Sequence, residues 1–362
     1  MALVHVRDML DHARHHGYAV GACTVRSLEF LEGVLEAAEN ARAPVILSLP
    51  ASPDNESHLE AMAAAAETAA RRASVPTAIH LEGCTNLSEA IQGINLGCNS
   101  IGVAAPTGWT PSDFQLALRI AEMAHGCGVP VTAGIASPED REAIAQALQA
   151  GIDFLSLPAV NDDTDPGAGL PGDVPEGVIL SMPGDNITED ALLSRFIAAG
   201  IARVDFDTTL MEGAGAWLRN ACDEDHIQLY GMRGAIVETA ERCLRRCGSE
   251  GRASEALTHC ASWKPVEHVI IYNVSGIGEH ATEGMMAEGR RILSGIPGVR
   301  RVITGKAVKE NAAYQYCWLV TFVHPDVIDS YREHPAHVAF ADKLFRPVAA
   351  ERISIDYKTS GD

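Results

Sequence analysis

The sequence predicts a (β/α)8 barrel followed by a small α+β domain. Over the first two-thirds of the chain, short apolar runs rich in β-forming residues alternate with alanine-, glutamate- and leucine-rich segments of helical period. Around residues 247–265 this alternation stops, and the remainder has a different order of strands and helices. At 362 residues, a chain with about two domains is expected.

Eight candidate strands precede the break, each separated from the next by a helical or loop segment. They are Tyr18–Cys23, Pro44–Leu49, Pro76–Leu81, Ser100–Val103, Val129–Ala133, Phe154–Leu157, Val178–Leu180 and Ala202–Phe206. Among the helical segments are Leu28–Ala41, Glu56–Arg72, Pro111–Ala124 and Pro138–Ala150. Eight such units in about 250 residues favour a barrel whose active site lies at the carboxyl ends of the strands.

The segment "CGSEGRASEALTHCASWKP" separates the two parts. No lysine precedes Lys264, whereas five lie from there to the end of the chain. We therefore place the barrel at 1–250, a linker at 251–264 and a second domain at 265–362. The second domain reads as strand (Val266–Val274), helix (Thr282–Leu293), two strands (Val299–Ala307, Tyr314–Phe322), helical segments (Pro325–Arg346) and a last strand (Ile353–Lys358).

Composition restricts the possible partners. The formal net charge of −20 disfavours nucleic acid and anionic membranes, because both require a basic surface. No apolar run approaches the roughly 20 residues that span a bilayer, and the first residues lack a signal-peptide core. The nine cysteines are scattered, odd in number and without a CxxC pair. A cytoplasmic protein with reduced cysteines is expected.

Several segments of the barrel, in order, resemble the class II (ketose-bisphosphate) aldolases. They are "GYAVGACTVRSLEFLEGVLEAAENARAPVILSL", "VPTAIHLEGCTNLSEAIQGINLGCNSIGV", "GIARVDFDTTL" and "RRCGSEGRA". The resemblance implies a TIM barrel, carbon–carbon lyase activity and, for the family, catalytic zinc.

The C-terminal part resembles the stress-responsive dimeric α/β-barrel (Dabb) family, a ferredoxin-like α+β fold. "VEHVIIYNV" and "SYREHPAHVAFADKLFRPVAAERISIDY" carry this resemblance, which implies a homodimer. The same stretches are similar to a plant polyketide cyclase that closes a ring by aldol condensation. Its catalytic tyrosine and histidine would correspond to Tyr331 and His337, with His268 nearby on the first strand.

The zinc ligands implied by the aldolase resemblance are missing. The family's third strand ends in HxDH, with an aspartate that transfers a proton and a histidine that binds zinc. Here the string is His80-Leu81-Glu82-Gly83, so a carboxylate is kept and the ligand is replaced by glycine. The two later histidines would fall in "PAVNDDTDPGAG" and in Ser181–Asn186, and neither stretch contains a histidine. We therefore predict no zinc site and no cofactor.

A replacement metal site remains an alternative. His80, Glu82, Cys84 and one of Asp162, Asp163 or Asp165 are ligand types for zinc. The oxygen-rich "NDDTD" would suit magnesium or calcium better. The same stretch is also compatible with a solvated loop or with a lid over the barrel.

Two further properties of family chemistry are disfavoured. A lysine Schiff base cannot form at a site made by the barrel alone, because the barrel has no lysine. The family's phosphate-binding loops correspond to Pro183–Asn186 and Asp205–Thr208, where a proline and added carboxylates oppose a dianion. A neutral or cationic substrate is expected, or a carboxylate held by Arg26.

We therefore expect Glu82 to be the catalytic acid or base, with His80 beside it. Each has a structural alternative, as a helix-capping carboxylate and as a core histidine. The expected substrate-binding residues are Arg26, Asp185, Asn186, Asp207, Thr208 and, in the small domain, His268.

Three functions follow. The first is an aldolase-like lyase that forms or cleaves a carbon–carbon bond, or enolises, a small non-phosphorylated carbonyl compound, possibly in specialised metabolism. The second is a cofactor-independent aldol cyclase whose catalytic residues Tyr331 and His337 lie in the C-terminal domain. The third is a non-catalytic barrel that binds or scaffolds.

Overall fold

A computed structural model describes residues 2–51, 56–104, 109–160, 162, 164, 170, 174–175, 177–221 and 229–359. The chain divides into two compact units. One comprises residues 1–90, 98–122 and 130–263, and the other 91–97, 123–129 and 264–362. The units are described separately below.

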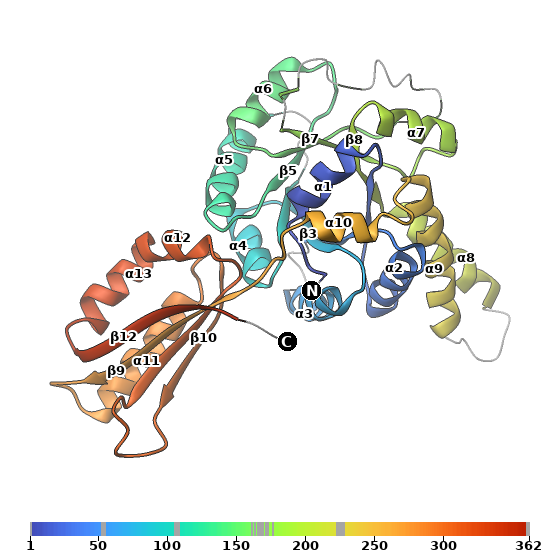
Figure 1. Ribbon diagram of the computed structural model, residues 1–362. Helices are drawn as coiled ribbons and strands as arrows, with labels where there is room; N and C mark the ends of the chain where they lie inside the picture. Colours follow the sequence, from blue (N-terminus) through green and yellow to red (C-terminus); the bar gives the residue numbers. More distant parts are fainter. Residues whose placement is uncertain are drawn as a thin grey trace. The chain divides into compact units, whose positions relative to one another are not determined.

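The first unit contains a closed parallel barrel whose strands follow the chain order, with β1 pairing with β8. Figure 1 shows these strands surrounded by helices. The strands are β1 (Val20–Thr24), β2 (Val45–Pro50), β3 (Thr77–Cys84), β4 (Ser100–Val103), β5 (Val131–Gly134), β6 (Phe154–Ser156), β7 (Ile179–Pro183) and β8 (Ile201–Phe206). All eight predicted strands are therefore confirmed.

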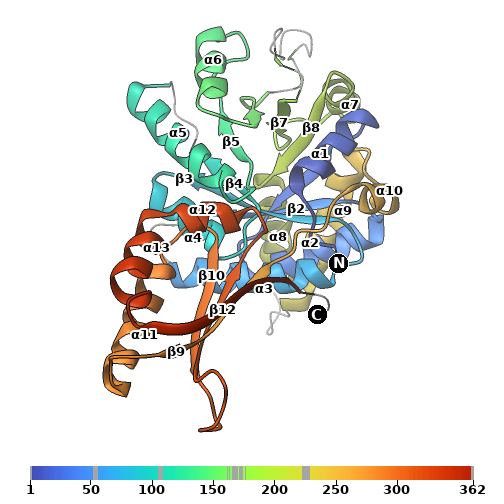
Figure 2. The ribbon, with the colours of Figure 1, turned by 60° about the vertical axis from the view of Figure 1, so that its left-hand side comes forward.

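A helix follows most of the barrel strands, and Figure 2 shows these helices from a second direction. In the described residues β6 is followed directly by β7, and β8 is followed by two helices. The barrel helices are α2 (Leu28–Ala41), α3 (Glu56–Arg72), α4 (Leu87–Asn95), α5 (Pro111–His125), α6 (Arg141–Gln149), α7 (Asp190–Ala198), α8 (Thr208–Ala221) and α9 (Leu229–Arg246). Helix α6 begins later than predicted from Pro138, because the Asp140 side chain accepts the Ala143 N–H and caps the helix there.

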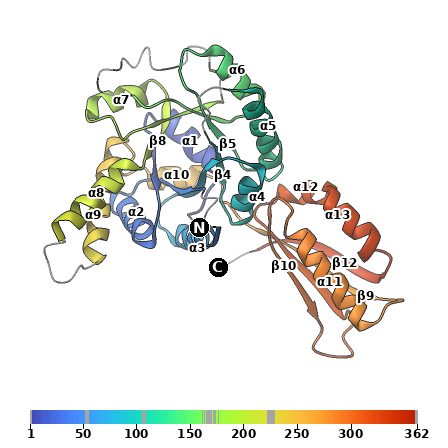
Figure 3. The same ribbon diagram turned by 180° about the vertical axis from the view of Figure 1, so that it is seen from behind.

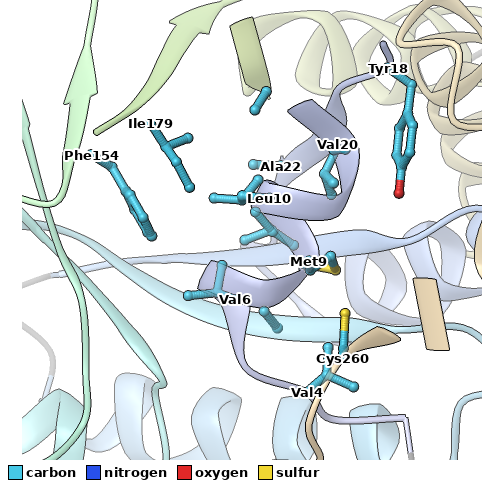
Figure 4. Close-up of a cluster of buried hydrophobic side chains, with 14 residues drawn as sticks. Val4, Val6, Met9, Leu10, Tyr18, Val20, Ala22, Phe154, Ile179 and Cys260 are labelled. Atoms are coloured by element: carbon cyan, nitrogen blue, oxygen red, sulfur yellow. The ribbon is translucent and has the colours of Figure 1, made fainter. Parts of the chain in front are cut away.

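The amino-terminal end of the barrel is closed by an apolar plug. Helix α1 (Val6–His15) inserts Val6, Met9 and Leu10 among the first residues of the strands (Figure 4). Val20, Phe154 and Ile179 belong to the same buried cluster. The interior at the amino-terminal ends of the strands is thus apolar and closed. The carboxyl ends of the strands form the open end of the barrel.

Within the predicted linker 251–264, the structure has a helix, α10 (Ala253–His259). It contacts α1, and Val4 forms an isolated bridge with Ser262. No helix of the described residues is long and apolar enough to cross a membrane.

The second unit contains a four-stranded antiparallel sheet in the order β10-β11-β9-β12. Its strands are β9 (Val266–Val274), β10 (Val299–Lys306), β11 (Tyr316–Phe322) and β12 (Ala349–Lys358). Helices α11 (Glu279–Leu293), α12 (Val327–Glu333) and α13 (Pro335–Phe340) and a π-helical turn (Ala341–Phe345) complete the fold (Figure 3). This is the predicted α+β domain.

Candidate functional site

Inward-facing residues at the carboxyl half of the barrel are polar. Residues paired across parallel strands project to the same face, so the register identifies them. One row runs Thr24, Ser48, His80, Ser100 across β1 to β4, and another runs Gly134, Ser156, Ser181, Arg203 across β5 to β8. The site is therefore built on rigid strands above the apolar plug.

Glu82 lies at the open end of β3. Its pairing with Pro50 continues the register that pairs His80 with Ser48, so His80 and Glu82 share the inward face. Directly after it, the β3–β4 pairing is irregular and Gly83 adopts φ +80°, a conformation that side chains disfavour. The Glu82 side chain is solvent-accessible, and no described side chain hydrogen-bonds its carboxylate.

The surroundings of Glu82 favour its protonated form. Partial desolvation at the barrel mouth, followed by the negative charge of Asp205, raises the pKa of Glu82 above its usual range. Asp207 acts in the same direction, while Arg203 and Arg26 oppose the shift. A carboxyl group with a raised pKa on a strand end is suited to taking and returning a proton.

His80 is a buried polar group. Its Nδ1 lies 2.9 Å from Ser100 Oγ, and a Cβ on Gly102 would lie 2.9 Å from its Nε2. Burial, with a smaller effect of the Arg203 charge, holds the pKa of His80 well below its usual range. The neutral ring is held between β3 and β4, which fits the core-histidine alternative.

Arg203 and Asp205 form a charged pair that was not among the predicted site residues. Arg203 is 2% exposed, and its Nε and Nη2 lie 2.7 and 2.6 Å from one Asp205 oxygen. Burial raises the pKa of Asp205, and the guanidinium opposes this shift. Arg203 and Asp205 alternate with apolar residues along β8, so the sequence indicates that both lie on one face of the strand, but it does not show that they pair.

Several predicted binding residues form hydrogen bonds with one another. Arg26 donates to both carboxylate oxygens of Asp207, at 2.9 and 2.7 Å, on an exposed rim. Asp185 accepts the backbone N–H groups of Asp207, Thr208 and Thr209 at 3.2, 3.1 and 3.0 Å. It therefore caps α8 at its first turn. Asn186 is exposed.

The metal ligands considered above do not come together in the described part of the chain. Asp162 accepts the N–H groups of Thr188 and Glu189, at 2.9 and 3.3 Å, in front of α7. Cys84 is buried, and desolvation raises the pKa of its thiol. Asp163 and Asp165 lie outside the described residues. Within the ranges described, no three His, Cys, Asp or Glu side chains are grouped to hold a metal ion.

The predicted residues of the small domain do come together. The Tyr331 and His337 ring centroids are 4.4 Å apart, and those of His268 and Tyr331 are 6.1 Å apart. His268 Nδ1 lies 2.6 Å from an oxygen of Asp356, which was not among the predicted site residues. Desolvation raises the pKa of Tyr331 and lowers that of His337.

Comparison with known proteins supports both resemblances. Residues 4–150 match the family "Fructose-bisphosphate aldolase class-II", and residues 266–359 match the "Stress responsive A/B Barrel Domain". The chain carries a class II aldolase domain followed by a Dabb domain.

Named relatives of the barrel are aldolases. The chain is 25% identical to the sulfofructosephosphate aldolase of Alkalicoccus urumqiensis over 289 residues, covering 70% of this chain and 99% of that protein. It is 26% identical to a probable fructose-bisphosphate aldolase of Bacillus subtilis over 286 residues, covering 70% of this chain and 100% of that protein. The crystal structure of the YdjI aldolase from Escherichia coli K12 has the same fold, with a TM-score of 0.61 and 23% identity over 69% of this chain and 99% of that one.

Proposed function

We propose that this aldolase-like enzyme forms or cleaves a carbon–carbon bond, or enolises, a small non-phosphorylated carbonyl compound, with Glu82 as the proton shuttle. The position of Glu82 carries the proposal. It is an accessible carboxyl group with a raised pKa, at the carboxyl end of a barrel strand, where barrel enzymes place their catalytic residues.

The absence of a phosphate from the proposed substrate rests on Asp185. A helix N-terminus binds anions through its free N–H groups. At the start of α8 the N–H groups of Asp207, Thr208 and Thr209 already bond to the Asp185 carboxylate. A phosphate dianion at this position would have to displace that carboxylate and would meet its charge.

The described residues do not fit the zinc site of the aldolase family. Gly83 offers no ligand where the family has a histidine, both His80 nitrogens face β4, and Asp162 caps α7. We therefore propose proton transfer by side chains alone. Elemental analysis of the purified protein, with activity measured before and after dialysis against a chelator, tests this. Stoichiometric zinc that activity requires would contradict it.

Proton exchange tests the role of Glu82 without knowledge of the natural substrate. We would incubate the protein with dihydroxyacetone in D2O and follow loss of the methylene signal by 1H NMR. Glu82→Gln should slow exchange by about 10²- to 10⁴-fold, the usual contribution of a general base. Glu60→Gln, the same change on the exposed face of α3, is the matched control. Exchange that survives in Glu82→Gln would contradict the proposal.

A second candidate function places the chemistry in the small domain. A histidine with a lowered pKa beside a buried tyrosine can act as base and proton donor in a cofactor-free aldol closure. His337 Nδ1 donates to the Arg332 carbonyl, 3.1 Å away, which leaves Nε2 as the basic nitrogen. Loss of exchange in His337→Ala, with Glu82→Gln unaffected, would favour this function. Binding without turnover would favour a scaffold.

A further inference from the structure

The interior of the barrel contains hydrogen-bonding atoms without partners in the described structure. They are Ser48 Oγ, Thr132 Oγ1, Ser181 Oγ and Arg203 Nη1, all of which lack a hydrogen-bond partner in the described structure. The exposed fractions of these residues are 2%, 6%, 0% and 2%. A buried polar atom left unpaired costs about 1–3 kcal/mol, so such atoms indicate a place for water or a ligand group.

These atoms lie on the inward face of the strands. Ser181 pairs with Arg203 across β7 and β8, and Ser48 pairs with His80 across β2 and β3. Thr132 pairs with Gly102, whose missing side chain leaves room beside the His80 ring. The orphan atoms therefore come from both halves of the barrel and face its axis.

Arg203 supplies the one charged donor among them. Asp205 occupies its Nε and Nη2, which orients the planar group and leaves the Nη1 hydrogens unpaired. Arg203 is close enough to lower the pKa of both His80 and Glu82 through its charge. By the register, Arg203 and His80 share the inward face of the barrel, and the Arg203 charge acts on Glu82 as well.

The charges around this point disfavour an anionic ligand. At the open end of the barrel the carboxylates of Glu82, Asp185, Asp205 and Asp207 outnumber the guanidinium groups of Arg26 and Arg203. A ligand carboxylate or phosphate would add charge of the sign already in excess. An uncharged carbonyl oxygen adds none before reaction.

We propose that Arg203 Nη1, with the Ser181 hydroxyl beside it, binds the carbonyl oxygen of an uncharged substrate and stabilises the enolate oxygen. Glu82 removes a proton from the carbon next to the carbonyl. The C–H electron pair forms the carbon–carbon double bond, and the carbonyl π pair moves to oxygen. Glu82 becomes neutral as the oxygen becomes negative, so the total charge of the site is unchanged while the negative charge moves towards Arg203.

This assignment rests on the proposed function of Glu82, and binding measurements separate the two. Arg203→Met/Asp205→Asn removes the buried charge pair together, so that no carboxylate is left unpaired. Glu67→Gln/Arg71→Met, on a largely buried pair of α3 outside the barrel interior, is the matched control for the loss of such a pair. Arg203→Lys keeps the positive charge but removes the planar guanidinium group with its several N–H donors.

We would measure two quantities for each protein: the exchange rate of dihydroxyacetone in D2O and its dissociation constant by NMR titration. The barrel double variant should lose about 10²- to 10³-fold in exchange, the usual cost of an oxyanion donor. Arg203→Lys should lie between it and the wild type, and the α3 control should match the wild type. Pyruvate and dihydroxyacetone phosphate should bind more weakly than dihydroxyacetone.

Unchanged exchange and binding in the barrel double variant would overturn the assignment while leaving the role of Glu82 intact. If the wild type exchanges no protons, the proposed function fails. The dissociation constants of dihydroxyacetone then test the Arg203 subsite by themselves. Dihydroxyacetone binding that weakens in the Arg203 variants would then support the subsite. Binding that is equal in the wild type and the variants, or no binding at all, would refute the subsite. Tighter Arg203-dependent binding of pyruvate or dihydroxyacetone phosphate would also overturn the uncharged substrate class.

Discussion

At the residue scale, the ionisation of Glu82 depends on its charged neighbours. Glu82 works as a base only when it has lost its proton, so activity should fall as the pH drops through its pKa. Because that pKa is raised, the acidic limb of the pH profile should lie above the range of an ordinary glutamate, about 4.3.

Two rim substitutions should move this limb in opposite directions. Asp207 raises the pKa of Glu82 and Arg26 lowers it. Asp207→Asn should therefore shift the limb to lower pH, and Arg26→Met should shift it to higher pH. Exchange rates of dihydroxyacetone across the acidic range measure both. Shifts of the same sign, or none, would show that the limb does not report Glu82.

The Asp185 carboxylate should be worth more to stability than an ordinary cap. It accepts three backbone N–H groups of α8, whereas Asp140 accepts one of α6. Loss of a cap costs about 0.5–2 kcal/mol in the free energy of unfolding. Urea titration should place Asp185→Ala near the upper end of that range and Asp140→Ala near the lower end. Equal losses would contradict the capping role.

Sequence patterns predicted that His80 and Glu82 lie at the carboxyl end of a barrel strand, where β3 places them. The patterns could not show that Glu82 suits an accessible acid or base whereas His80 suits a core histidine. That distinction depends on the register, which holds the His80 ring against Ser100 and Gly102 and leaves Glu82 accessible. The Arg203–Asp205 pair and the Asp185 cap were not predicted, since each depends on which atoms meet after the barrel closes.

At the element scale, close packing between α2 and α9 depends on Gly33. A Cβ there would lie 2.8 Å from Ile236 of α9. Helix propensity therefore favours alanine at position 33, whereas packing against α9 favours glycine. Gly234 of α9 has no atom within 4 Å of an added Cβ.

Alanine at these two glycines should therefore have opposite effects on the free energy of unfolding. Gly234→Ala should stabilise by about 0.5–1 kcal/mol, the gain of replacing glycine inside a helix. Gly33→Ala should destabilise by about 1–3 kcal/mol, the usual cost of overpacking. Urea titration measures both, and stabilisation by Gly33→Ala would show that the α2–α9 contact is looser than described.

At the scale of the whole molecule, one face of the small domain's sheet bears an apolar row. Ile355, Val269, Leu319 and Ile303 follow one another across β12, β9, β11 and β10. Ile355 and Ile303 are 43% and 37% exposed, whereas the opposite face packs Trp318 against Phe340 of α13. An exposed apolar face of this kind fits the homodimer that the Dabb resemblance implies.

A charge in that row should break the predicted homodimer. Ile355→Lys would place a lysine at the interface, and sedimentation should change from dimer to monomer. Val308→Lys, on a fully exposed loop residue, should leave the assembly unchanged. A wild-type protein that sediments as a monomer would refute the homodimer directly.

We propose above all that the barrel, through Glu82, carries the proton transfer. A single base fixed on β3 should remove one hydrogen of each methylene pair, so dihydroxyacetone should acquire deuterium in one stereochemical sense. The configuration of the monodeuterated product, determined by NMR, measures this directly. We expect stereospecific labelling that Glu82→Gln abolishes and His337→Ala retains. Labelling that is retained in Glu82→Gln and lost in His337→Ala would contradict it.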